Sequence, residues 1–253
     1  MARHMLLVSN VTDEKGTDLG AALAAPRRYV DWINHHIGFN PRGQKHSDAL
    51  SAFILDDLRF LCPTLNGLLA SGELRVNLNA ELRTRVVARN IDLVISRSAA
   101  GDSVETAALT IEHKTIMAAH GKARKNRYGD FIAYSNHVHN HSPAAIAAGT
   151  LVVNCSPSYE NPDEWARKVS RKAGNFAKVV HSTVELFRSI PPRELVGDPG
   201  DQPEALCVLL IDYDGRNGAT LVTSEMSLAD ADPLSYGSFC ARLARLFEAR
   251  NAR

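Results

Sequence analysis

Residues 107–116 constrain the fold of this chain more than any other segment, because an apolar run ends there in an acid and a lysine. Side chains at positions i and i+2 of a β-strand share a face. Glu112 and Lys114 are therefore expected on one side of a strand, with Ile111 and His113 on the other. The segment predicts a strand that presents two opposite charges on a single face.

A second strand-like run, residues 90–95, carries Asp92 among apolar side chains. The polar connection over residues 96–105 suits a turn between two neighbouring antiparallel strands. In that arrangement the carboxylates of Asp92 and Glu112, together with the ammonium group of Lys114, would converge at one edge of the sheet.

This group of side chains favours hydrolysis assisted by a divalent metal. Mg²⁺ prefers oxygen ligands, commonly one or two carboxylates, with water and substrate phosphate completing its shell. Asp92 and Glu112 would supply carboxylate oxygens and the backbone carbonyl at His113 a third ligand, with Mn²⁺ as a possible substitute for Mg²⁺. The ammonium group of Lys114 would stabilise an attacking hydroxide or the charge that develops on a phosphate.

These residues resemble the PD-(D/E)xK nuclease superfamily, which includes most type II restriction endonucleases. Asp92 matches the first acid of its motif, and Glu112 and Lys114 match the second acid and the lysine. Ile91 stands where the signature has proline, a position that varies within the superfamily. The resemblance implies a Mg²⁺-dependent endonuclease that hydrolyses phosphodiester bonds of double-stranded DNA. It also implies a role in defence against foreign DNA, most simply as a type II restriction enzyme.

A chain with one such site would cut both strands of a duplex most simply as a two-fold homodimer. The competing interpretation of Glu112 and Lys114 is a solvated strand end with an ordinary ion pair. The order of the elements along the chain favours the nuclease.

The helix expected over residues 47–61 begins at Ser47 as its N-cap and repeats apolar side chains every three to four residues. Asp57 falls inside that apolar stripe, where a carboxylate is costly unless it meets a cation, a metal or a hydrogen-bond donor. The superfamily often places a further acid on this helix, so Asp57 is a candidate catalytic residue. An ion pair with Arg83 or Arg85 is the alternative.

The expected fold class is α/β, a restriction-endonuclease-like core with a central mixed β-sheet flanked by helices. Its order is αβββαβ, followed by a C-terminal helix, a hairpin and a last helix. Residues 1–253 are expected to form a single domain, with 1–25 as a peripheral arm or partly as residues added for expression. After the first helix, the expected elements are strands at 73–79, 83–95 (a strand pair or one bent strand) and 107–116, a helix at 120–139, a strand at 150–155, a helix from Asn161 to Ile190, a hairpin of 206–213 with 219–223, and a helix at 233–249.

Basic residues gather directly after the proposed catalytic strand, although the net charge of the chain is only +1. They would open a helix near the metal, where they could neutralise phosphates beside the one that is cleaved. A solvated basic helix face is the alternative. The expected nucleic-acid contacts are Lys122, Arg124, Lys125, Asn126, Arg127 and Tyr128, with His120 next to them.

The strongest rival signal is the run that contains His137, His139 and His141. On a helix, His137 and His141 would share a face and could hold a transition metal, which would indicate a histidine-ligated phosphoesterase or a structural zinc site. A third possibility is a catalytically inactive nucleic-acid-binding protein with a nuclease-like fold.

Other classes leave no comparable pattern. The sequence has no P-loop, no GxGxxG after a strand and no GxSxG motif. No apolar stretch is long enough for a membrane span, and the four cysteines lie far apart without a CxxC pair. A soluble cytoplasmic protein with free thiols is therefore expected.

Overall fold

The structure, a computed structural model, describes residues 23–36, 39–40, 43–97, 106–159, 173–223 and 226–251. Its helices are α2 (Ala25–His35), α3 (Gln44–Leu61), α4 (Pro63–Ala70), α5 (His120–His141), α6 (Ala173–Arg188) and α7 (Tyr236–Asn251). Its strands are β1 (Leu74–Arg83), β2 (Ala88–Arg97), β3 (Ala107–Ile116), β4 (Ile146–Asn154), β5 (Ala205–Tyr213) and β6 (Ala219–Leu221).

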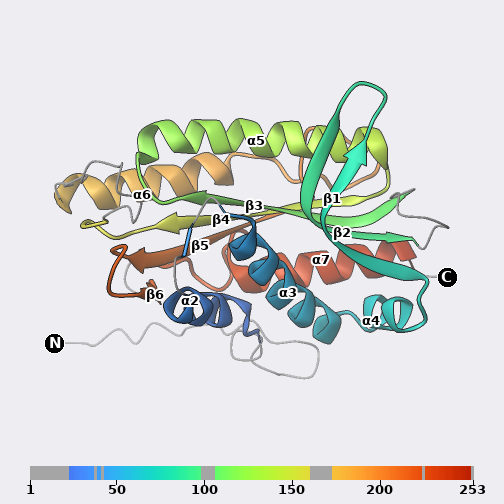
Figure 1. Cartoon of the computed structure of the whole chain (residues 1–253). Coiled ribbons are helices and arrows are strands. Elements are labelled where there is room, and N and C mark those ends of the chain that lie inside the picture. Colours follow the sequence, from blue (N-terminus) through green and yellow to red (C-terminus); the bar gives the residue numbers. More distant parts are fainter. Residues whose placement is uncertain are drawn as a thin grey trace, which may run out of the picture.

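The strands form one mixed sheet in the order β1-β2-β3-β4-β5-β6. β3–β4 and β4–β5 are parallel pairs, whereas β1–β2, β2–β3 and β5–β6 are antiparallel pairs. Figure 1 shows α5 and α6 over one face of the sheet and α2, α3, α4 and α7 over the other. The expected α/β class with a central mixed sheet is confirmed, as is the antiparallel pairing of the strands that carry Asp92 and Glu112.

Each face of the sheet has its own apolar core because the central strands are covered on both sides. Leu93 and Ile111 belong to the core under α2, α3 and α7, whereas Val94 and Leu151 belong to the core under α5 and α6. Every residue of β4 is buried. The alternation of β3 thus sends successive side chains into two different layers, which determines where its charged residues point.

Several sequence-based boundaries are confirmed and others need correction. The strand at 107–116 and the hairpin of β5 with β6 occur as expected. The segment 83–95 is divided by a turn at 84–87, so β1 and β2 form a hairpin. Ser47 does not cap its helix, because α3 begins at Gln44 and buries Ser47 within its first turns. The sequence patterns missed α2 and α4, and the expected helix start at Asn161 lies outside the described residues.

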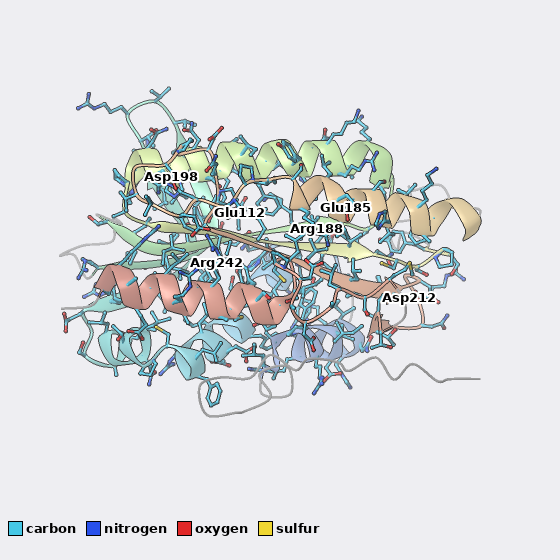
Figure 2. The ribbon with its side chains drawn as sticks, turned by 180° about the vertical axis from the view of Figure 1, so that it is seen from behind. Glu112, Glu185, Arg188, Asp198, Asp212 and Arg242 are labelled. Carbon is cyan, nitrogen blue, oxygen red and sulfur yellow. The ribbon has the colours of Figure 1, made fainter. Side chains whose placement is uncertain are left out.

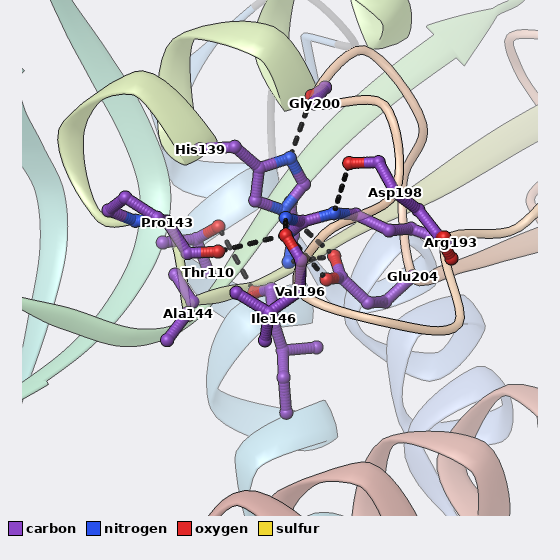
Figure 3. Close-up of polar contacts among 12 residues, drawn as sticks. Thr110, His139, Pro143, Ala144, Ile146, Arg193, Val196, Asp198, Gly200 and Glu204 are labelled. Atoms are coloured by element: carbon purple, nitrogen blue, oxygen red, sulfur yellow. Dashed lines mark hydrogen bonds and ion pairs between the residues drawn. The ribbon is translucent and has the colours of Figure 1, made fainter.

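A buried ionic cluster around Glu204 connects the segment between α6 and β5 to α5 and α7 (Figure 3). The carboxylate of Glu204, which is fully buried, contacts the guanidinium groups of Arg193 at 3.2 Å and Arg250 at 2.9 Å. Its other oxygen lies 3.1 Å from Nε2 of His139 and accepts the backbone N–H of Ala147.

Within the described part of the chain, no helix is long and apolar enough to cross a membrane.

Candidate active site

The candidate site lies where β2 and β3 separate. The two strands pair from Ser96–Ala107 to Leu93–Ile111. Beyond that pair, the backbone N–H of His113 on β3 donates to the side chain of Asp92 on β2. Asp92 Oδ2 accepts the backbone N–H of His113 at 2.7 Å, and Oδ1 lies 3.4 Å from Nε2 of Gln44. Both strands are interior to the sheet, so the expected position at a sheet edge is wrong.

Glu112 points to the face covered by α5 and is only 3% exposed (Figure 2). Its Oε1 lies 3.0 Å from Nη2 of Arg89 and also accepts a hydrogen bond from Nζ of Lys114. Its Oε2 is buried and has no hydrogen-bond partner. Glu112 and Lys114 thus share a face as their spacing predicted, and a buried carboxylate oxygen remains available for a ligand.

The packing around Glu112 closes the site on the side of β4. Gly149 lies next to Glu112 in the parallel register, and a Cβ at Gly149 would come within 2.2 Å of the ring of Phe131 on α5. Tyr134, one turn further along α5, bonds to Thr110 at 2.6 Å between hydroxyl oxygens. The guanidinium of Arg89 lies over the ring of Tyr134, 5.8 Å from its centroid. Access to Glu112 is therefore left to the side of Arg89 and Lys114, which are partly exposed.

His113 points to the opposite face, towards α3. Its ring nitrogens lie 2.8 Å from the hydroxyl of Ser51 and 2.7 Å from that of Thr150. Burial lowers the pKa of His113 to about 3, so the imidazole is neutral near pH 7. Because both ring nitrogens have protein partners on the far face, only the backbone carbonyl of His113 remains for the expected metal ligation.

The donor set suits Mg²⁺ in its chemistry. Two carboxylates are associated with the same short stretch of β3. Glu112 is part of that strand, and Asp92 accepts the backbone N–H of the following residue, His113. The unpartnered Oε2 of Glu112 is a buried, hard oxygen ligand. Among the described residues no three histidine, cysteine or acidic side chains form a metal-binding group, so any ion here would take much of its shell from backbone, water or substrate oxygens.

Asp57 has a different partner set from the one expected. Its oxygens accept the backbone N–H groups of Ala24 at 3.2 Å and Ala25 at 2.9 Å, and the hydroxyl of Tyr236 at 2.7 Å. Gln44 on the same helix reaches Asp92, but Asp57 lies roughly 20 Å further along the axis at about 1.5 Å per residue. Asp57 therefore caps the start of α2, and neither the catalytic role nor the ion pair with Arg83 or Arg85 is observed.

The basic cluster at the start of α5 divides into exposed and half-buried members. Lys122, Lys125 and Asn126 are exposed, and Lys122 and Asn126 line a cavity of about 270 Å³ at the end of β3. The others are half-buried and have protein partners: Arg124 bonds to Ser182, Arg127 pairs with Asp130 at 2.7 Å and also lines this cavity, and Tyr128 packs against Phe187. The first turn of α5 has no acidic residue and no side-chain cap, which leaves its positive end uncompensated.

The three rival histidines do not share a site. Nε2 of His137 lies 2.8 Å from the carbonyl of Leu82, and His139 belongs to the cluster around Glu204. His141 lies with Nδ1 2.8 Å from the hydroxyl of Ser142. Each imidazole thus has its own protein partner, and the described residues around them form no metal-binding group.

Sequence reasoning missed two residues at this site, Arg89 and Gln44. Arg89 precedes Asp92 by three positions, but only the register between β2 and β3 reveals that it reaches Glu112. No family profile matches the chain, and no similar sequence is found among curated proteins.

Proposed function

We propose that the chain is a Mg²⁺-dependent endonuclease that hydrolyses phosphodiester bonds of DNA. One observation carries the proposal: Glu112 is buried against Arg89 and Lys114 with a free Oε2, and the carboxylate of Asp92 accepts the backbone N–H of the next residue, His113. A buried carboxylate with an unsatisfied oxygen costs stability unless it serves a ligand. Buried charged groups that lack a full set of partners occur preferentially at functional sites.

The roles follow from the contacts. Asp92 and Glu112 would hold the ion, and Asp92 is kept in place by the N–H of His113. Lys114 and Arg89 would stabilise charge that develops on the phosphate, because both already lie against Glu112 Oε1 and both remain partly exposed. Mg²⁺, when bound, would neutralise phosphate charge and favour ionisation of the attacking water.

The order of elements supports assignment to a restriction-endonuclease-like core. α3 and the short α4 precede three consecutive strands, and α5 and β4 follow them, which corresponds to the αβββαβ order with α4 as an addition. In this assignment the first acid lies on β2, and the second acid and the lysine lie on β3. Defence against foreign DNA and a homodimer that cuts both strands remain the biological expectations.

Incubation of the purified chain with linear duplex DNA tests this function. We expect cleavage with Mg²⁺ or Mn²⁺ and none after addition of EDTA. Discrete bands would indicate recognition of a sequence, and a smear would indicate a non-specific nuclease. A parallel digestion of RNA of the same length measures the preference for DNA over RNA. Absence of cleavage from both nucleic acids with either ion would contradict the proposal.

A further inference from the structure

The hairpin of β1 and β2 extends past the sheet beside α5 (Figure 1). Its last strand pair is Arg83–Ala88, and residues 84–87 form the tip. The N–H of Thr84 donates to the carbonyl of Val87 at 2.9 Å, and the hydroxyl of Thr84 accepts the N–H of Val87 at 3.2 Å. These bonds between side chain and backbone give the tip a defined shape.

The tip exposes two apolar side chains. Val86 is 94% exposed and Val87 is 55% exposed. These two adjacent apolar side chains on a projecting turn contribute nothing to the core and are open to a binding partner.

A groove of about 810 Å³ runs between this tip and the C-terminal half of α5. Arg85 and Arg89 line it from the hairpin, and Asn136 and Asn140 line it from α5. No acidic side chain is among its lining residues. Within the described part of the chain, Arg85 has no acidic partner, whereas the neighbouring Arg83 pairs with Glu81. The groove therefore combines positive charge, amide groups and an apolar tip.

Arg89 connects this groove to the candidate active site. The same guanidinium that lines the groove lies 3.0 Å from Glu112 Oε1. A phosphate bound beside Arg89 would thus be one side chain away from Glu112. The groove is the surface from which a polyanion can reach that carboxylate.

We propose that the hairpin tip and this groove bind duplex DNA next to the cleaved phosphodiester. This inference rests on the proposed nuclease function and names the substrate surface of the same site. Arg85 contacts a phosphate, and Val86 and Val87 pack against sugar and base edges in the minor groove, where many architectural DNA-binding proteins insert apolar side chains. The one ring that lines the groove, His137, is only 6% exposed and bonds to the carbonyl of Leu82, so the groove offers no open platform on which bases of a single strand would stack, which favours a duplex.

A thiol at the tip provides a direct test, because all four cysteines of the chain are buried. Val86→Cys would add an exposed thiol whose rate of maleimide labelling reports contact. The matched control is Phe60→Cys, at a position that is 66% exposed on α3, over the opposite face of the sheet. Ca²⁺ replaces Mg²⁺ so that binding is measured without turnover.

With duplex DNA at ten times the Kd of each variant, labelling of the Val86→Cys thiol is expected to slow about tenfold, and labelling of the Phe60→Cys thiol to stay unchanged. A large loss of DNA affinity in Val86→Cys alone would also support contact at the tip. Equal labelling with and without DNA would overturn the proposal. Slow labelling that depends on protein concentration without DNA would also overturn it, because a second copy of the chain would then cover the tip.

Arg85→Gln gives an independent measurement. The slope of log K against log salt should fall by about 0.9 if Arg85 contacts one phosphate. Arg75→Gln is the control, since Arg75 is exposed near the start of β1, roughly 26 Å along the strand from Arg83 at about 3.3 Å per residue, and the turn that carries Arg85 lies beyond Arg83. If both slopes match the wild type, the groove proposal fails even where Mg²⁺-dependent cleavage persists. If the wild type does not bind DNA at all, the nuclease proposal fails with it.

Discussion

The carboxylate of Asp92 accepts the backbone N–H of His113 at 2.7 Å, in the place where a strand-to-strand hydrogen bond would otherwise form. This contact fixes an acid of β2 against the β3 segment that carries Glu112 and Lys114. The pairing of the two strands ends at Leu93–Ile111, and the candidate site lies directly beyond that pair.

Arg89 should weaken divalent-ion binding, because it places a positive charge 3.0 Å from Glu112 Oε1. Arg89→Gln is expected to increase the affinity for Mn²⁺ about fivefold, an energy on the order of 1 kcal/mol for a partly exposed charge. Isothermal titration measures the change. Arg83→Gln, on the exposed end of β1, should leave the affinity unchanged. Unchanged or weaker binding in Arg89→Gln would show that the ion does not bind at Glu112.

Asp57 should act in stability rather than in catalysis. Asp57→Ala removes acceptors for Ala24, Ala25 and Tyr236, and should lower the free energy of unfolding by about 1–3 kcal/mol. Asp56→Ala, which breaks only an exposed pair with Arg28, should cost at most about 1 kcal/mol. Denaturant titrations measure both values. Loss of DNA cleavage in well-folded Asp57→Ala would restore Asp57 as a catalytic acid.

Glu204 should be among the largest single contributors to stability. Glu204→Gln leaves the guanidinium of Arg193 buried without its charged partner and should cost about 3–5 kcal/mol. The control is Glu194→Gln, which breaks a pair with Arg242 in which Glu194 is largely exposed and should cost at most about 1 kcal/mol. Comparable costs in the two variants would contradict the role of the buried cluster.

The same cluster predicts sensitivity to acid. Burial raises the pKa of Glu204, but hydrogen bonding and charge from His139 outweigh it, so the pKa lies below its ordinary value of 4.5. A depressed carboxyl pKa stabilises the fold above pH 4.5, and this contribution is lost as the pH falls through the folded-state pKa. Glu204→Gln should therefore flatten the dependence of stability on pH below 4.5. If the dependence of stability on pH below 4.5 is the same in Glu204→Gln as in the wild type, other carboxyl groups control the loss of stability in acid.

His137 and His141 should not be needed for metal-dependent activity, because they bond separately to the carbonyl of Leu82 and the hydroxyl of Ser142. The double change to glutamine should retain Mg²⁺-dependent cleavage. His139 is left in place because it supports Glu204. Elemental analysis should find no stoichiometric zinc in the wild type. Loss of one bound zinc together with activity in the double variant would instead support the histidine-ligated site.

The sequence contains enough information for the elements whose pattern is local. β3 occurs with the expected bounds because its alternation and its flanking polar residues coincide, and that alternation correctly places Glu112 and Lys114 on one face. The buried position of Asp57 is likewise correct. The partners expected for Asp57 are wrong, because the observed ones belong to α2, many residues before it, and to α7, many residues after it. No pattern near Asp57 in the sequence indicates these contacts.

The remaining features of the site depend on contacts between distant segments. Arg89 reaches Glu112 only because of the register of β2 on β3, and Gln44 reaches Asp92 only because of where α3 crosses the sheet. The turn at 84–87 lacks glycine and proline, so the break between β1 and β2 has only a weak sequence signal. Periodicity predicts which face a residue occupies, but it does not predict the neighbour that it meets.

The most direct test of the account is the Mg²⁺-dependent rate of DNA cleavage in Asp92→Ala and Glu112→Ala, compared with the wild type and with Glu81→Ala. Glu81 is an exposed acid on β1 that pairs with Arg83 and does not contact the site. Each site variant should lose at least about a hundredfold in rate while its thermal unfolding shows an intact fold. Glu81→Ala should cleave at the wild-type rate. Cleavage that survives in both site variants at near the wild-type rate would contradict the account and locate the active site elsewhere.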